Sequence, residues 1–315
     1  MDIDYLLFLQ DLRNATGGIF DEFFNSISKF AVDILPMLSF VLFWCVDKKW
    51  GYRFIVTHRI GSLINGIIKL TVCAYRPWIR SDLIEPAGDS KVSATGYSFP
   101  SGHTMTATAI CGSTVVWQRK KRRWIAVLCI VLILLTAFSR NFLGVHTPQD
   151  VLVALAESIV VIFIVNKVAD KIGENDKVID ILTIIGCFFL IAVILYVTFK
   201  PYPMDYVNGE LLVDPKTMLK DVFGASGAVF GLLLGSFIER HWLHYEIPKG
   251  SANLGLLTAI GLGILIAWDT WFASATVVQL FGRDWGNYVA KFLMVFFAIV
   301  IWPLVIRKFN KAETN

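Results

Sequence analysis

The sequence predicts an all-α fold, a polytopic bundle of about nine transmembrane helices preceded by an amphipathic helix in the membrane interface. Composition gives the first support, because 56% of the 315 residues are hydrophobic and only 17% are charged, against roughly 25% charged residues in a soluble domain. The mean hydropathy of +0.61 points the same way. The apolar residues also gather into runs that approach the length of a bilayer span.

Nine apolar runs account for most of the chain. Several are shorter than the roughly 20 residues that a bilayer requires, so we expect them to extend into their flanks. One of them, 101–117, is rich in Thr, Ala, Ser and Gly, which suits a helix buried among other helices. The predicted spans are 31–46, 54–75, 101–117, 124–139, 150–166, 180–199, 222–238, 254–272 and 289–306.

We divide the chain into three predicted parts. Charges interrupt residues 4–28 and leave an apolar face, which predicts an N-terminal interfacial helix over 1–30. A catalytic helical core is expected over 31–170. Additional transmembrane helices follow over 171–315, and the sequence does not reveal their role.

The arrangement of basic residues predicts the orientation in the membrane. Five consecutive basic residues, 119–123, should lie in the cytoplasm. The loops alternate sides, so the polar motifs below should face outward and the C-terminus should be cytoplasmic. The small formal charge of +4 is spread along the chain, which argues against nucleic acid as a partner. We expect a bacterial plasma membrane rather than a eukaryotic endoplasmic reticulum.

Two features of the C-terminal half predict helix packing. Gly227, Gly231 and Gly235 recur every four residues, a pattern typical of closely packed helices, either within the chain or in a homodimer. Asp269 and Lys291 lie in or near predicted spans, and we expect them to pair with each other.

The first polar motif combines two cations at the outer end of the second predicted span. Lys69 and Arg76 are seven residues apart, which brings them to nearly the same helix face. Pro77 disfavours helix at Arg76 and marks the end of the span. Lys69 alone could simply extend its amine to the interface. Together, the two cations suggest a site that holds phosphate oxygens.

The second motif is Pro100-Ser101-Gly102-His103, at the start of a predicted helix. Ser101 is a candidate N-cap, and Gly102 allows the backbone to approach a ligand. The free N–H groups of a helix start can bind an anion. His103 alone would more often be structural, but beside such an anion it is a candidate acid for the leaving group.

The third motif runs from Ser139 to Asp150 and supplies a cation, a histidine and a carboxylate. Arg140 ends one predicted span, and Thr147 with Asp150 resembles a capping box at the start of the next. Asp150 is four residues after His146, close enough to accept a hydrogen bond from its imidazole. That bond would leave the other ring nitrogen free to attack, although Asp150 could also act only as a helix cap.

These three motifs resemble the signature of the type-2 phosphatidic acid phosphatase superfamily, which is Lys-x6-Arg-Pro, Pro-Ser-Gly-His and Ser-Arg-x5-His-x3-Asp. The resemblance covers residues 30–166 and matches every signature position. It implies His146 as nucleophile, Asp150 as its orienting group and His103 as the acid. It also implies that the phosphoryl oxygens are held by Lys69, Arg76, Ser101, Gly102 and Arg140.

The resemblance implies an integral membrane phosphatase that hydrolyses a lipid phosphate or diphosphate through a phosphohistidine on the non-cytoplasmic face. Phosphatidate, undecaprenyl diphosphate and sphingoid phosphates are candidate substrates. We keep two other enzymes open, a phosphatase of a soluble sugar phosphate, which a nine-span layout favours, and a lipid headgroup phosphotransferase. A non-catalytic lipid binder or transporter is the alternative from another class.

The motif loops hold no Asp, Glu and His cluster suited to Mg²⁺ or Zn²⁺. We therefore expect neither a metal nor another cofactor. Glu157 lies two helical turns beyond Asp150 on the same face and is a candidate to support the site.

Overall fold

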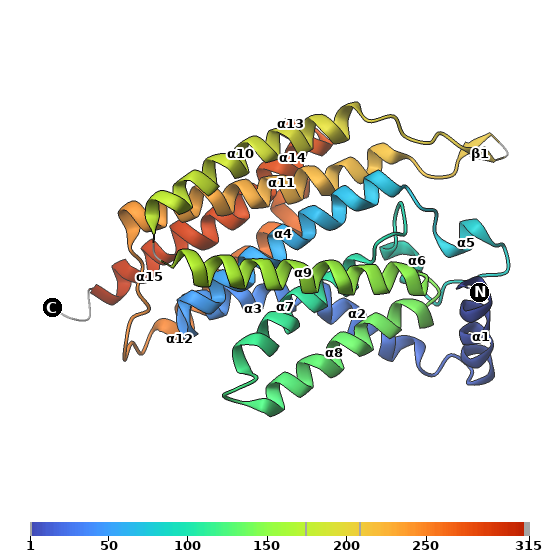
Figure 1. Cartoon of the computed structure of the whole chain (residues 1–315), viewed down its shortest axis with the longest axis horizontal. Helices are drawn as coiled ribbons and strands as arrows, with labels where there is room; N and C mark the ends of the chain where they lie inside the picture. The colour runs from blue at the N-terminus through green and yellow to red at the C-terminus, as the bar shows by residue number, and fades with distance from the viewer. Residues whose placement is uncertain (1, 174, 208, 312–315) are drawn as a thin grey trace. The chain divides into compact units, whose positions relative to one another are not determined.

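A computed structural model describes residues 2–173, 175–207 and 209–311 and confirms the all-α class (Figure 1). The sheet in this part of the chain is one antiparallel ribbon, in which β1 (Tyr206–Val207) pairs with β2 (Glu210–Leu211). The chain forms two compact units, each built from three segments. Unit 1 comprises Met1–Pro36, Ile60–Ile164 and Pro201–Met218; unit 2 comprises Met37–Arg59, Val165–Lys200 and Leu219–Asn315.

The helices of unit 1 come mainly from the first half of the chain. They are α1 (Asp2–Ala15), α2 (Asp21–Asp33), α5 (Pro77–Arg80), α6 (Ser90–Ser93), α7 (Gly102–Gln118) and α8 (Arg123–Phe142). Residues 60–72 of α4 (Lys48–Val72) and residues 148–164 of α9 (Pro148–Ile172) also belong to it.

Unit 2 holds the remaining helices, several of which contain π-helical segments. They are α3 (Leu35–Val41), η1 (Leu42–Val46), α10 (Asp176–Phe199), α11 (Pro215–Ile238), η2 (Glu239–Leu243), α12 (Leu254–Ala267), η3 (Trp268–Val277), α13 (Val278–Phe281), α14 (Arg283–Phe296), η4 (Phe297–Ile301) and α15 (Trp302–Lys311). The first two residues of α3 and the first four of α11 fall in unit 1.

Helix α7 is the central helix of unit 1 and packs against α8, while α2 packs against both (Figure 1). Ten of its 17 residues are buried, and most of these are Thr, Ala or Ser. Small side chains allow neighbouring helices to approach closely. The expectation of a buried helix over 101–117 is therefore confirmed.

Seven helical segments of the described chain are long and apolar enough to cross a membrane, which supports an integral membrane protein. The count of about nine is not confirmed. Helix α7 is too short at 17 residues, and polar side chains such as His58, Arg59 and Asn65 lower the hydropathy of α4. The segments are Asp21–Val46, Arg123–Phe142, Pro148–Ile172, Asp176–Phe199, Pro215–Leu243, Leu254–Trp271 and Arg283–Asn310.

The N-terminal region forms two helices, and an interfacial helix over 1–30 is not confirmed. The chain turns at Gly17 and Gly18, which both adopt positive φ. Helix α2 then starts a span-length segment that continues to Val46. Its Phe24 ring lies 4.6 Å from that of Phe142, so the apolar face of α2 packs on α8. The three-part division of the chain remains a prediction.

The glycine stripe of α11 packs against α14 within unit 2. A Cβ atom on Gly227 would lie 2.0 Å from the carbonyl oxygen of Tyr288, and one on Gly231 would lie 2.6 Å from that of Phe292. This contact within the chain accounts for both glycines, while a homodimer remains a prediction. Lys291 and Asp269 form the expected ion pair.

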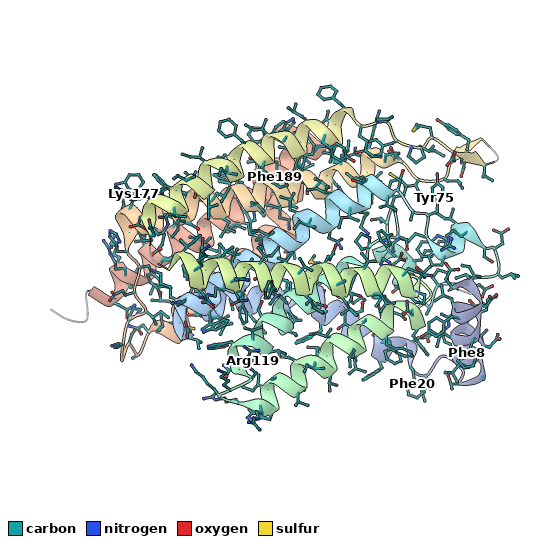
Figure 2. All side chains as sticks on the ribbon, in the orientation of Figure 1. Phe8, Phe20, Tyr75, Arg119, Lys177 and Phe189 are labelled. Carbon is teal, nitrogen blue, oxygen red and sulfur yellow. The ribbon has the colours of Figure 1, made fainter. Side chains whose placement is uncertain are left out.

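Apolar side chains also cover the outer face of α10 in unit 2. Phe188 is 69% exposed and Phe189, which is labelled in Figure 2, is 51% exposed. An exposed apolar face of this kind suits contact with lipid chains.

Candidate active site

All eight predicted site residues fall in unit 1, so their geometry belongs to one compact unit. They come from helix ends and from the loops between them. Lys69 is near the end of α4 and Arg76 follows it, Arg140 is near the end of α8, and His146 precedes α9. Ser101, Gly102 and His103 start α7, and Asp150 lies in the first turn of α9.

Asp150 serves both as a helix cap and as the partner of His146. Its Oδ2 atom lies 3.2 Å from Nδ1 of His146 and accepts a 2.8 Å bond from the N–H of Thr147. The N–H of Asp150 donates in return to Oγ1 of Thr147 at 3.4 Å. The two alternatives for this carboxylate are therefore compatible, since one oxygen atom performs both tasks.

This contact defines the tautomer of His146. An ionised carboxylate only accepts hydrogen bonds, so Nδ1 carries the proton and Nε2 holds a lone pair that can accept a hydrogen bond. Nε2 lies 2.9 Å from Nη1 of Arg76, which can donate only. The unprotonated nitrogen therefore faces a cation that can hold a phosphate oxygen.

The surroundings keep His146 neutral. The side chain is 3% exposed. Burial lowers the pKa of His146 well below its ordinary value of 6.5, and the charges of Arg76, Arg140 and Lys69 lower it further. A neutral imidazole at neutral pH is the form that a nucleophile requires.

Arg76 is held in place by main-chain carbonyl groups. Its Nη2, Nε and Nη1 atoms donate to Thr95 at 3.0 Å, to Gly96 at 3.2 Å and to Val145 at 3.0 Å. Burial lowers the pKa of Arg76 to about 10, so the guanidinium keeps its charge at neutral pH. The cation is thus fixed beside His146 before any ligand arrives.

Lys69 binds the loop that precedes α7. Its Nζ atom donates to the carbonyl oxygens of Pro100 at 2.8 Å, Ser98 at 3.2 Å and Tyr97 at 3.3 Å. The lysine therefore holds the second motif in place and adds its charge to the site. Direct contact between Lys69 and a phosphate oxygen remains a prediction.

The start of α7 has the expected cap. Oγ of Ser101 accepts from the N–H of Thr104 at 3.4 Å, and the N–H of Ser101 donates to the main-chain oxygen of Asp150 at 3.0 Å. A Cβ atom on Gly102 would meet its nearest neighbour only at 3.8 Å, at Oδ1 of Asn65. Gly102 therefore leaves room beside the helix start, where a ligand could approach.

Arg140 presents unused hydrogen-bond donors. It is 1% exposed, and its Nη1 donates to Oγ of Ser28 at 2.5 Å. Its Nε and Nη2 atoms are buried without a hydrogen-bond partner among the described residues. Unpaired guanidinium donors are costly in an apolar interior, and a bound anion would satisfy them.

His103 is the second residue of α7 and is partly buried. Burial lowers the pKa of His103 well below its ordinary value of 6.5, and the charges of Arg140, Arg76 and Lys69 lower it further, as they do for His146. The structure thus brings both histidines into the field of the same three cations.

Sequence reasoning missed three residues that support the site. Oγ of Ser98 donates to Oδ2 of Asp150 at 2.5 Å, and Nδ2 of Asn141 donates to the carbonyl of His146 at 2.9 Å. Ser28 contacts Arg140 from α2 and is 1% exposed. Ser98 and Asn141 are close in sequence to the motifs, whereas Ser28 is separated from Arg140 by 112 residues, and no local pattern links the two.

We expect Ser28→Ala to raise the KM for a phosphate substrate about tenfold, because hydrogen bonds to charged groups contribute about 1.5–3 kcal/mol. Arg140 would lose the partner that orients it, while kcat should change less. Ser26→Ala on the same helix is the matched control, since the exposed hydroxyl group of Ser26 donates to Oε1 of Glu22 at 3.5 Å and lies outside the site. Steady-state kinetics with both variants measure the effect, and equal KM values for the two would contradict this role.

The sequence is similar to a known protein family and to several known proteins. Residues 50–174 match the model of the PAP2 superfamily. The undecaprenyl-diphosphatase BcrC of Bacillus subtilis is 34% identical over 161 residues, which cover 49% of this chain and 77% of that protein.

Two further relatives are more distant. An undecaprenyl-diphosphatase of Sulfolobus acidocaldarius is 25% identical over 118 residues, which cover 38% of this chain and 54% of that protein. The phosphatidylglycerophosphatase B of Bacillus subtilis is 24% identical over 153 residues, which cover 46% of this chain and 70% of that protein. The chain thus spans about half the length of one curated relative and more of the other two. No solved structure matches it.

Proposed function

We propose that this chain, which belongs to the PAP2 superfamily, is an integral membrane phosphatase that hydrolyses a lipid phosphate or diphosphate. The position of His146 carries the proposal. The protonated Nδ1 of His146 is directed at Asp150, and the unprotonated Nε2 is directed at Arg76. This arrangement suits attack on phosphorus, and the names of the relatives point to lipid phosphates and diphosphates.

In the proposed first step, Nε2 of His146 attacks the phosphorus atom and the P–O bond to the leaving group breaks. The negative charge of a bound phosphate offsets the cations that lower the pKa of His103, so that His103 can hold a proton and donate it to the departing oxygen. Asp150 stabilises the imidazole as it becomes positively charged. The product of this step is a phosphohistidine and the free lipid alcohol, or a lipid monophosphate when the substrate is a diphosphate.

In the second step, water attacks the phosphohistidine. His103, now neutral, takes a proton from this water, and the P–N bond breaks as the pair of electrons returns to Nε2. Inorganic phosphate leaves and both histidines regain their starting protonation states. Each step therefore balances without an external oxidant or reductant.

Charge stabilisation comes from Arg76, Arg140 and the start of α7, with Lys69 adding its field. The transition state spreads negative charge over the phosphoryl oxygens, and fixed cations offset it without rearrangement. We propose that no metal takes part. Among the described residues, no group of three His, Cys, Asp or Glu side chains could hold one.

We further propose that the site faces the non-cytoplasmic side. The basic turn between α7 and α8 contains Arg119, at the opposite end of these two helices from His103 and Arg140 (Figure 2). Basic loops favour the cytoplasm, which would leave the histidines at the outer surface.

A phosphate-release assay in detergent tests this function. The purified chain should release phosphate from long-chain lipid phosphates or diphosphates much faster than from glucose 6-phosphate, and EDTA should leave the rate unchanged. Faster release from the soluble sugar phosphate would favour that alternative. Transfer of the phosphoryl group to a second lipid without free phosphate would indicate a phosphotransferase, and no turnover of any phosphate would contradict the proposal.

The pH dependence follows from the environment of His146. Its pKa lies well below 6.5, so the neutral nucleophile persists at mildly acidic pH and protonates only on further acidification. On the acidic side we expect kcat/KM to be maintained down to pH 6.5 and to fall at lower pH, while loss of the proton from His103 should set a separate decline towards alkaline pH. A kcat/KM profile, with thermal stability followed over the same range as control, measures this. A decline that begins above pH 6.5 would contradict the expectation.

A further inference from the structure

A second polar layer lies next to the phosphoryl site within unit 1. Glu157 follows Asp150 by seven residues on α9, and Asn65 precedes Lys69 by four residues on α4. Both spacings return to the same helix face. Nδ2 of Asn65 donates to Oε1 of Glu157 at 2.5 Å, which joins the two helices.

This pair borders the start of α7. Oδ1 of Asn65 lies 3.8 Å from the position of a Cβ atom on Gly102. The next residue of α9, Ser158, donates to the main-chain oxygen of Met105 at 3.3 Å. The charge of Lys69 also acts on the carboxylate of Glu157. Asn65 therefore links Glu157 to the start of α7, where the phosphate is expected to bind.

One carboxylate oxygen of Glu157 lacks a hydrogen-bond donor among the described residues. Oε2 of Glu157 is buried and has no hydrogen-bond partner in the described part of the chain. A buried carboxylate oxygen without a donor is costly, and an ionisable residue within a transmembrane segment usually has a function. The cost would disappear if a ligand supplied the donor.

The neighbouring cation, Lys69, binds main-chain oxygens. Lys69 has three N–H donors, and three main-chain oxygens accept bonds from its Nζ atom. The oxygens of an ionised phosphate only accept hydrogen bonds, so the phosphoryl group itself cannot satisfy a carboxylate. A donor on another part of the substrate would satisfy this oxygen.

We propose that Glu157 determines substrate specificity by accepting a hydrogen bond from a hydroxyl or ammonium group close to the substrate phosphate. This inference rests on the proposed function and narrows its substrate class. Lysophosphatidate and sphingoid-type lipid phosphates carry such donors near the ester carbon, whereas both remaining glycerol hydroxyls of phosphatidate are acylated. Polyprenyl phosphates carry only hydrocarbon there and would leave Oε2 unpaired.

Three lipid monophosphates of equal chain length test the proposal. A lysophosphatidate offers a hydroxyl group, a sphingoid-base phosphate offers an ammonium group as well, and an alkyl phosphate offers neither. We expect wild-type kcat/KM for each donor-bearing lipid to exceed that for the alkyl phosphate by about tenfold, the size of one charge-assisted hydrogen bond. The two donor-bearing lipids distinguish a hydroxyl from an ammonium group as the ligand.

Glu157→Gln should reduce these ratios several-fold, most of all for the ammonium lipid, because it replaces the accepting oxygen with a donor and removes the charge. Asp170→Asn is the matched control on the same helix. Asp170 pairs with Arg53 at 2.5 Å within unit 2, so this variant should keep the wild-type ratios.

Equal wild-type kcat/KM values for all three lipids would overturn the inference, and this measurement does not depend on the folding of any variant. A uniform loss for all three lipids in Glu157→Gln would also overturn it, because it would indicate a purely structural role. Failure of the proposed function would look different, since wild-type protein would then release phosphate from none of the lipids.

Discussion

His146→Ala is expected to lower kcat/KM for phosphate release by at least ~10⁴, because the attacking nitrogen is lost and no other side chain takes its place. The variant should also form no phosphorylated enzyme, whereas the wild type should yield an acid-labile adduct after rapid quenching with a labelled substrate. The two readouts together separate loss of the nucleophile from loss of substrate binding.

His241→Ala provides the control for this experiment. His241 lies in unit 2, where its Nε2 contacts Asp180 at 3.1 Å, and it has no proposed part in the reaction. The His241→Ala variant should therefore retain both phosphate release and formation of the phosphorylated enzyme. Phosphate release by a folded His146→Ala protein at the wild-type rate would refute the assignment of the nucleophile.

The second large effect is expected at Asp150, where two substitutions separate its two tasks. Asp150→Asn can still accept the bond from the N–H of Thr147 through its amide oxygen, so the helix cap should survive. It cannot stabilise a positively charged imidazole as a carboxylate does. We expect kcat to fall by a factor on the order of 10³ or more, with little change in thermal stability.

Asp150→Ala removes both functions. It should show the same loss of kcat together with a loss of stability of about 1 kcal/mol, typical of a missing helix cap. Comparing kcat with the melting temperature for the two variants measures the separation. If Asp150→Asn kept wild-type kcat, Asp150 would serve only as a cap, and the proposed orienting role would be wrong.

The spacing of residues along the chain predicted those interactions of the site that form within a single helix start. His146 and Asp150 are four residues apart across the start of α9, and Ser101 caps α7 as its position suggested. Interactions of this kind follow from helix geometry alone. They can be predicted because both partners belong to the same short segment.

Contacts between distant segments could not be predicted in this way. Spacing placed Lys69 near Arg76, but gave no sign that the lysine would bind the carbonyl groups of residues 97, 98 and 100. The partner of Arg140 comes from α2, which only tertiary packing reveals.

The same limit applies to the membrane spans. The apolar runs correctly predicted helices throughout, including α4 and α7, but hydropathy alone does not separate a helix facing lipid from one buried among other helices. Acidic residues at 21 and 22 suggested an interfacial segment. In the structure they occupy the first turn of α2, where negative charge favours the positive end of the helix.

The contact between Ser28 and Arg140 has a practical consequence for protein production. A serine near the beginning of the chain completes the surroundings of a cation that is synthesised much later. Removal of α2 would take away the hydroxyl group to which Nη1 of Arg140 donates. Variants made for expression should therefore keep the chain from α2 onward.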